Sequence, residues 1–259
     1  MRPSISIIIP QHKTYEVTRL CLRALRKFSK LDVEVIVVDN NSQDESVAYL
    51  KQNKWIKLIE NYNAPIGGQG HKQALDIGVK AASGEWVLLF HSDTIVLKDG
   101  WDIMLLELLD RHPNAVGASS TIREINKFLV WYKKGFRYIK EWDSYFHHKL
   151  KPTNEKIMSY CFILKRDFLI SSNFSFELAT GDVADALYKT KIKEKHEFIL
   201  MGRLFLDKLL WHTSNVSSIF TGQINDRKSV KKFQRKMRGL FSTNLVSNLI
   251  NDETLDNFD

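Results

Sequence analysis

The stretch VEVIVVDNNS at residues 33–42 decides the fold class. Its first six residues are mostly β-branched and nearly all apolar, which is typical of a strand buried on both faces of a sheet. The DNNS that follows suits a tight turn or the N-cap of a helix. An earlier run, ISIII at residues 5–9, has the same character and ends at Pro10, which cannot donate to a sheet ladder. The two runs therefore predict two buried strands.

A helix is predicted between these strands, and the pattern then repeats. Apolar residues recur at helical spacing at Val17, Leu20, Cys21, Ala24, Leu25 and Phe28. A third strand at 56–59, a glycine-rich turn at 67–70, a helix with a small-residue face at 74–82 and a strand at 86–90 follow. This alternation over residues 1–120 predicts an α/β fold with a Rossmann-like, mostly parallel sheet flanked by helices.

Composition restricts the class of protein further. The chain has 259 residues, 44% hydrophobic and 26% charged, which is close to the soluble globular average. Its apolar runs are shorter than the roughly 20 residues needed to span a bilayer. Cys21 and Cys161 are far apart, so we expect reduced, buried thiols and a cytoplasmic protein. The net charge of +8 suits nucleic acid, anionic lipid or a phosphorylated substrate, and does not choose among them.

The second half of the chain is less regular. Aromatic residues crowd residues 128–146, where core or lid packing is favoured over a sugar-binding platform. Strands are predicted at 158–164 and 208–211, and helices begin at 166 and 181. We expect a catalytic domain at 1–222, with halves at 1–120 and 121–222, and a basic amphipathic helical extension at 223–259.

Polar side chains close several of the predicted strands. Ligands of such sheets gather beyond the carboxyl ends of the strands, where Asp39 and Asp93 fall. Asp182 opens a helix after a glycine, and His212 follows the last predicted strand. A carboxylate and an imidazole there could share a divalent cation with diphosphate oxygens, and a further carboxylate could accept the proton of an attacking hydroxyl. The alternatives are turn and helix caps for the acids and a structural role for the histidine.

Together these segments resemble family 2 glycosyltransferases, which have the type A glycosyltransferase fold. SISIIIP at 4–10 is similar to the opening strand of the family, and VVDNNSQDES at 37–46 to its nucleotide-binding segment. The tripeptide HSD at 91–93 stands where the family has its Asp-x-Asp metal motif. KRDF at 165–168 with GDV at 181–183 resembles the acceptor-side segment, and WHTS at 211–214 resembles the later histidine segment. The resemblance covers residues 4–218 with the motifs in family order.

The resemblance implies an inverting transfer of a sugar from a nucleotide-diphosphate donor to an acceptor hydroxyl. It implies Asp182 as the general base, and Asp93 and His212 as ligands of Mn²⁺ or Mg²⁺. The donor, a UDP- or dTDP-sugar, would contact Pro10, Asp39, Asn41, Gly68, Lys72, His91, Ser92 and Asp93. The acceptor would be a glycan or lipid-linked sugar in the synthesis of cell-surface polysaccharide.

Two positions depart from the family pattern. His91 replaces the usual first acid of the metal motif, and Gly181 stands where the family often has Glu. The second departure leaves Asp182 without its common acidic neighbour. Asp185, one helical turn further along, is therefore the rival candidate for the general base.

Other functions remain as alternatives. A nicotinamide dehydrogenase would require a glycine fingerprint after the first strand, and the sequence has no glycine there. A P-loop enzyme would require the motif G-x-x-x-x-G-K-[ST], which the sequence lacks. A sugar-nucleotide pyrophosphorylase shares the layout and is the enzymatic alternative. A nucleic-acid-binding protein that uses the basic residues after 225 is the non-enzymatic one, although we expect no nucleic-acid partner. The same segment could rest on an anionic membrane rather than pack on the domain.

Overall fold

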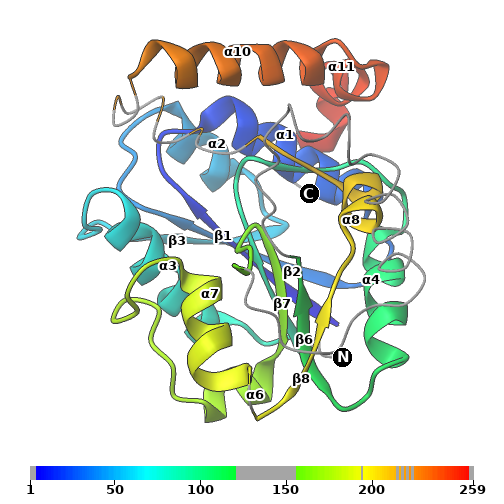
Figure 1. Ribbon diagram of the computed structural model, residues 1–259. Helices are drawn as coiled ribbons and strands as arrows, with labels where there is room; N and C mark the ends of the chain where they lie inside the picture. Colours follow the sequence, from blue (N-terminus) through cyan, green and yellow to red (C-terminus); the bar gives the residue numbers. More distant parts are fainter. Residues whose placement is uncertain are drawn as a thin grey trace.

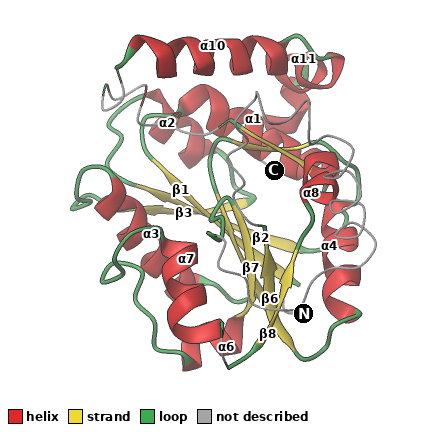
Figure 2. Ribbon diagram, viewed as in Figure 1, coloured by secondary structure: helices red, strands yellow, loops and turns green. Residues whose placement is uncertain are grey.

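The computed structural model describes residues 4–120, 156–193, 195–213, 216, 219, 222 and 225–256. Within these residues a seven-stranded sheet has the order β3-β2-β1-β4-β7-β6-β8 (Figures 1 and 2). Its strands are β1 (Ile5–Gln11), β2 (Val33–Asp39), β3 (Ile56–Glu60), β4 (Trp86–Phe90), β6 (Ala115–Ser119), β7 (Cys161–Lys165) and β8 (Glu197–Leu200). The predicted aromatic segment at 128–146 lies outside the described residues.

The sheet is mixed and mostly parallel, as the sequence predicts. β1 pairs in parallel with both β2 and β4, and β2 pairs in parallel with β3. β7 runs antiparallel between β4 and β6, while β8 pairs in parallel with β6. The reversal places the residues that precede β7 beside the carboxyl end of β4, because Cys161 is the register partner of Phe90.

Helices cover both faces of the sheet. One face holds α1 (Tyr15–Phe28), α2 (Glu45–Gln52), α4 (Trp101–Asp110), α8 (Arg203–Leu209) and α11 (Asn244–Asn251). The other holds α3 (Gly68–Ala81), α6 (Arg166–Ser171) and α7 (Val183–Leu187), which continues as a π-helical turn at Tyr188–Ile192. Ile7 packs on the first face and Ile8 on the second. Because successive strand residues point to opposite faces and both are covered, the central strands are continuous apolar runs.

A small residue is required where α3 crosses β1. A Cβ built on Gly78 would lie 2.3 Å from Cγ2 of Ile8, so a side chain there would push the helix off the sheet. The predicted close packing of this helix is confirmed. Cys21 and Cys161 are both buried and unpaired, also as predicted.

Several predicted boundaries were wrong. The glycine-rich residues 68–70 form the first turn of α3 rather than a turn before it, and only Gly67 has a positive φ, of 73°. Residues 208–209 end α8, so the predicted strand at 208–211 is β9 (Leu210–His212), which begins two residues later and ends one residue later. The predicted strand at 158–164 begins only at Cys161. The two strand errors concern short elements, whose limits depend on tertiary pairing rather than on local pattern.

The C-terminal segment forms α10 (Arg227–Phe241), α11 and a 3₁₀ turn at Glu253–Asp256. In Figure 1 α10 lies as an outer layer beyond α1 and α2. Val246 and Leu249 of α11 belong to the same buried cluster as Leu20 and Leu25 of α1. Among the described residues, no helix combines the length and apolarity required to cross a bilayer.

Candidate active site

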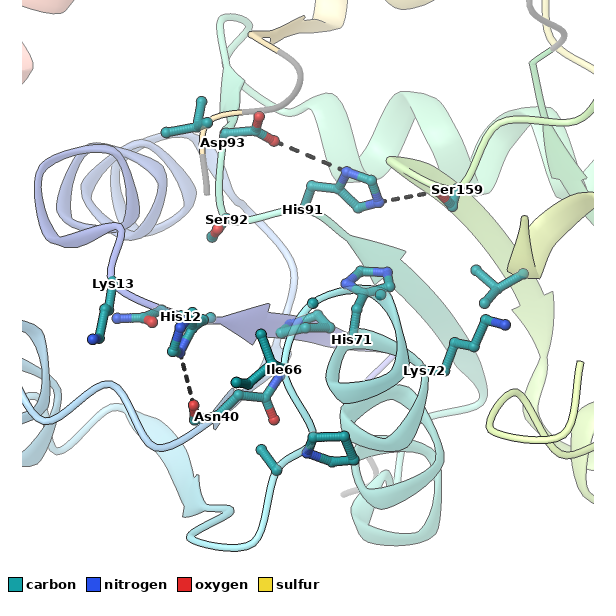
Figure 3. A pocket seen from close by; sticks show the side chains of 18 of the residues that line it. His12, Lys13, Asn40, Ile66, His71, Lys72, His91, Ser92, Asp93 and Ser159 are labelled. Carbon is teal, nitrogen blue, oxygen red and sulfur yellow. Dashed lines mark hydrogen bonds and ion pairs between the residues drawn. The ribbon is translucent and has the colours of Figure 1, made fainter. Parts of the chain in front are cut away.

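A cavity of about 950 Å³ opens beyond the carboxyl ends of β1, β2 and β4 (Figure 3). The first half of the chain contributes strand ends and the N-terminus of α3, and the second half contributes the residues before β7 and at the start of α7. The described residues that line it include Pro10, Gln11, His12, Lys13, Asn40, Asn41, Gly67, Gly68, His71, Lys72, His91, Ser92, Asp93, Ser159, Gly181, Asp182 and Val216. The sequence therefore predicted the correct edge of the sheet.

Asp93 and His212 are brought together by a second, two-stranded sheet. β5 (Thr94–Val96) pairs antiparallel with β9, and Thr94 is the register partner of His212. Thr213 completes the pairing, since its backbone N–H and its hydroxyl both donate to the carbonyl oxygen of Asp93. As a result His212 Nε2 lies 3.2 Å from Oδ1 of Asp93. The same oxygen lies 3.9 Å from Nδ1 of His91.

The electrostatics of this group favour an anionic Asp93 beside neutral His91. Burial alone would raise the pKa of Asp93, but the adjacent His212 imidazole outweighs it and holds that pKa well below the usual range. Burial at the cavity wall, with the neighbouring imidazoles of His212 and His71, lowers the pKa of His91 to about 3. A neutral imidazole retains a lone pair at neutral pH, which is the form that ligates metals.

The donor set fits a divalent cation. Ligand atoms from His91, Asp93 and His212 all lie within 4.8 Å of one another, close enough to surround one ion. Imidazole nitrogen and carboxylate oxygen are common ligands of Mn²⁺ and its neighbours in the first transition series. The group could therefore hold such an ion at the cavity edge.

Asp182 lines the same cavity from the second half of the chain, and Asp185 is not among the described residues that line it. Asp182 caps α7, where its Oδ1 accepts from the backbone N–H of Ala184 at 3.2 Å. Its other oxygen is 3.7 Å from Nζ of Lys156, and about a quarter of the side chain is exposed. The Asp185 carboxylate instead accepts from the backbone N–H of Ile157 at 3.2 Å and pairs with Lys189 at 2.7 Å.

Asp39 stands behind the cavity wall rather than in it. Its carboxylate accepts from both the backbone N–H and the hydroxyl of Ser42, at 3.0 and 2.6 Å, and it is not among the described residues that line the cavity. Burial raises the pKa of Asp39 in spite of these two bonds. The carboxylate thus shapes the loop that presents Asn40 and Asn41, which do line the cavity. The helix that follows is capped by Asp44, which accepts from the backbone N–H of Ser46.

The N-terminus of α3 forms another part of the wall. Gly67, Gly68 and Lys72 line the cavity there, and Lys72 donates to the carbonyl oxygen of Ala179. Gly70 has no room for a side chain, because a Cβ would lie 2.1 Å from the carbonyl oxygen of Pro65. Unpaired N–H groups at the start of a helix attract anions, so this wall suits a phosphate.

Among the residues of the site that sequence reasoning missed, four make side-chain contacts there. His71 lies 5.2 Å, ring to ring, from His91 and interacts electrostatically with both Asp182 and Asp93. Ser159 contacts His91, and the ring of Tyr160 stacks on His212 with centroids 4.3 Å apart. His12 contacts the carbonyl oxygen of Asn40 at 2.8 Å. A histidine at the start of a glycine-rich helix was a usable signal for His71, whereas Ser159 and Tyr160 reach the site only through the pairing of β4 with β7.

Solved glycosyltransferases share this fold. Staphylococcus aureus TarS 1–349 in complex with UDP-GlcNAc has a TM-score of 0.61 at 14% identity, over 96% of this chain and 72% of that one. The mannosyltransferase PcManGT from Pyrobaculum calidifontis, in complex with GDP-Man and Mn²⁺, has a TM-score of 0.59 at 14% identity, over 98% and 76%. The molecule thus has a fold of the type A glycosyltransferase class.

Sequence comparison gives the family. Residues 6–171 match Glycosyl transferase family 2, and since this is more than half of the chain, the chain belongs to that family. The GalNAc(5)-diNAcBac-PP-undecaprenol beta-1,3-glucosyltransferase of Campylobacter jejuni is 23% identical over 209 residues, 78% of this chain and 65% of that protein. Glycosyltransferase GlyG of Streptococcus pneumoniae is 24% identical over 120 residues, 45% of this chain and 38% of that protein. This chain spans less than two thirds of the length of these two relatives.

Proposed function

We propose that the protein is a metal-dependent, inverting glycosyltransferase that moves a sugar from a nucleotide-diphosphate donor to an acceptor hydroxyl. The observation that supports this most directly is that Asp93 and Asp182 line one cavity, Asp93 as part of a group that fits a cation and Asp182 on the opposite half of the chain. Family membership and the fold of the solved neighbours support the same reaction class.

In this proposal each part of the cavity has a separate task. Residues 1–120 hold the nucleotide and diphosphate, and residues 121–222 hold the acceptor. The walls of the donor half are Pro10, Asn41, Gly68, Lys72 and Ser92, with Asp39 supporting the loop behind them. A cation bound by Asp93 and His212 would offset the charge that develops on the departing nucleoside diphosphate.

The chemical step is a single displacement. Asp182 accepts the proton of the acceptor hydroxyl. At the same time the hydroxyl oxygen forms a bond to the anomeric carbon, and the bond from that carbon to the diphosphate breaks. The products are an inverted glycoside and a nucleoside diphosphate. Positioning of the two substrates in one cavity supplies much of the rate.

Relatives support the proposed classes of donor and acceptor. TarS was solved with UDP-GlcNAc, and the Campylobacter jejuni relative is named for a polyprenol-linked glycan. We propose a UDP- or dTDP-sugar donor and a glycan or lipid-linked acceptor in cell-surface polysaccharide synthesis. Contact between the basic side of α10 and the inner face of a membrane would bring such an acceptor to the cavity.

Calorimetry with UDP and dTDP, in Mn²⁺ and in chelator, tests the proposal. Mn²⁺ should tighten binding by about 5–150-fold, the usual range for coupled ligands. Asp93→Ala should abolish this difference, whereas Asp99→Ala, which removes an exposed carboxylate paired with Lys30, should keep it. Equal affinity for both nucleotides in chelator and in Mn²⁺ would contradict the metal dependence.

Product analysis separates the proposal from the pyrophosphorylase alternative. Incubation of the protein with a panel of UDP- and dTDP-sugars and glycan acceptors should release nucleoside diphosphate. Formation of nucleoside triphosphate from a sugar nucleotide and pyrophosphate, without transfer, would favour the alternative instead.

A further inference from the structure

The first residue of the tripeptide His91-Ser92-Asp93 is an imidazole where the family resemblance leads one to expect a carboxylate. We propose that Nδ1 of His91 is a third protein ligand of the divalent cation, and that Ser159 is the positioning residue that fixes this ring. The inference rests on the proposed metal dependence and adds two things to it: the identity of a further ligand and a preference among cations.

The geometry places one oxygen at the centre of the group. Oδ1 of Asp93 lies 3.2 Å from Nε2 of His212 and 3.9 Å from Nδ1 of His91. Ligands that share one ion at about 2.1 Å are roughly 3–4 Å from one another. Both separations fall in that range, and one ligand atom of each of the three residues lies within 4.8 Å of the other two, so the three side chains can bind one ion after side-chain adjustment.

The opposite nitrogen of His91 indicates which tautomer the site selects. Nε2 lies 3.0 Å from Oγ of Ser159, as Figure 3 shows, with the ring between Ser159 and Asp93. A ligating histidine usually donates its other ring N–H to an acceptor, which fixes both tautomer and orientation. With hydrogen on Nε2, the Ser159 hydroxyl accepts it, and the lone pair of Nδ1 faces Asp93.

Ser159 is itself held in place by the sheet. It lies two residues before Cys161, the register partner of Phe90 at the end of β4. The hydroxyl of Ser119 donates to the carbonyl oxygen of Met158 at 2.7 Å. The backbone N–H of Met158 donates to the carbonyl oxygen of Ser120 at 2.9 Å. Ser159 is 8% exposed, so it is a fixed, buried partner.

The next residue holds the second imidazole. The ring of Tyr160 stacks on that of His212 with centroids 4.3 Å apart and planes 11° from parallel. Two consecutive residues thus orient both histidines of the group. Such support matters for a ligand set, because ligation depends on ring orientation.

The donor set then determines the cation. Mg²⁺ strongly prefers oxygen ligands, whereas two imidazoles and one carboxylate suit Mn²⁺, Co²⁺ or Zn²⁺. The site should therefore bind Mn²⁺ more tightly than Mg²⁺. An aspartate at position 91 should narrow that difference, because it replaces a nitrogen ligand by oxygen.

The test uses the full chain, Mn²⁺ and Mg²⁺ as probes, and no sugar donor. Calorimetry should show tighter binding of Mn²⁺ in the wild type, and pulsed electron paramagnetic resonance of bound Mn²⁺ should show two coupled imidazole nitrogens. His91→Ala should leave one coupled nitrogen and weaken Mn²⁺ binding. Ser159→Ala should weaken it by about 10–100-fold, as loss of a ligand's hydrogen-bond partner does. His91→Asp should reduce the preference for Mn²⁺ over Mg²⁺.

Matched controls are His196→Ala and Ser171→Ala, both exposed residues outside the cavity lining, which should bind Mn²⁺ like the wild type. The number of imidazole nitrogens coupled to Mn²⁺ is measured on the wild type, so the proposal can be tested even if a variant misfolds. One coupled nitrogen in the wild type, with Mn²⁺ still tightening UDP binding, overturns the His91 assignment and leaves the proposed function standing. Absence of Mn²⁺ binding overturns both.

Discussion

At the scale of single residues, the described contacts separate two acids that the sequence alone could not. Asp182 and Asp185 are one helical turn apart and both belong to the start of α7. Asp185 is held by the backbone N–H of Ile157 and by Lys189, so its carboxylate serves the fold. Asp182 instead lines the cavity, where one of its oxygens caps the helix and the other lies 3.7 Å from Nζ of Lys156. The proposal of Asp182 as the base rests on this difference in position.

Asp182→Asn should lower turnover by about 10²–10⁴-fold, because the amide cannot accept the proton of the acceptor hydroxyl. Asparagine is as good an N-cap as aspartate, so α7 should remain folded. Affinity for the nucleotide donor should barely change, since the lost interaction acts in the transition state. Steady-state kinetics and donor calorimetry measure the two effects separately. The control is Asp185→Asn; loss of transfer in this variant alone would show that the wrong acid was assigned.

The sequence predicted some site residues and not others for a physical reason. Asp93 and His212 each end a short apolar run, so their position at the sheet edge follows from local pattern. Ser159 and Tyr160 have no such signal, because they reach the histidines through the antiparallel insertion of β7 between β4 and β6. The direction of a short strand is a tertiary property, and no local propensity encodes it.

At the scale of elements, the C-terminal segment is joined to α1 by a buried ion pair. Arg23 is 1% exposed, because the C-terminal segment covers the side of α1 that carries Arg19 and Arg23. Its guanidinium donates to the carboxylate of Asp256 and to the carbonyl oxygens of Leu249 and Ile250. Arg19 and the hydroxyl of Tyr49 reach the same carboxylate. A charge on a buried helix face requires such a partner, which local sequence cannot reveal.

Asp256→Asn should lower the free energy of unfolding by about 2 kcal/mol. This is less than the usual cost of breaking a buried pair, because the carbonyl oxygens of Leu249 and Ile250 still accept from Arg23 and because solvent reaches the side chain at position 256. Burial alone would raise the pKa of Asp256, but hydrogen bonds from Arg23, Arg19 and Tyr49 outweigh it and lower that pKa. The stabilisation is therefore present at neutral pH and is lost as the pH falls below the ordinary carboxyl pKa of about 4.

Urea unfolding at several pH values measures this prediction. The wild type and Asp256→Asn should differ at pH 7 and converge in acid. Asp99→Ala removes an exposed carboxylate paired with Lys30 and should leave the unfolding midpoint close to that of the wild type. A constant difference across the pH range would mean that the ion pair is not the source of the stability.

At the scale of the whole molecule, the sequence predicted the centre of the fold better than its edges. β1, β2, β3 and β4 are apolar runs whose alternation with helices fixes a parallel sheet. The far edge was missed, because β6 is the short, small-residue run AVGAS and β8 has four residues. Such strands form because neighbours are already in place, and their sequences carry little propensity of their own.

The docking of α10 leaves its basic side outward. Phe233 is buried with Val17 of α1 and Val216, a residue that lines the cavity. The apolar side of the helix is thus used by the fold. Arg227, Lys228, Lys231, Arg235 and Arg238 remain exposed, and residues 227–241 contain no acid. Contact between α10 and a membrane would therefore rest on its basic residues. Because Phe233 of α10 packs on Val216 of the cavity wall, such contact would place the cavity near the bilayer.

Lys231→Glu combined with Arg235→Glu should weaken binding to vesicles that contain anionic phosphatidylglycerol by at least tenfold, since each basic residue near such a surface contributes about 1 kcal/mol. Wild-type binding should also disappear in roughly 1 M salt, where charges beyond about 3 Å are screened. Vesicle sedimentation measures both effects.

Truncation before α10 is a poor test, because it removes Asp256 from Arg23. The matched control replaces the exposed Lys54 and Lys80, which lie outside α10, by glutamate, so the net charge changes by the same amount. Equal loss in both double variants would indicate attraction by net charge alone, and salt-resistant binding would contradict the electrostatic contact.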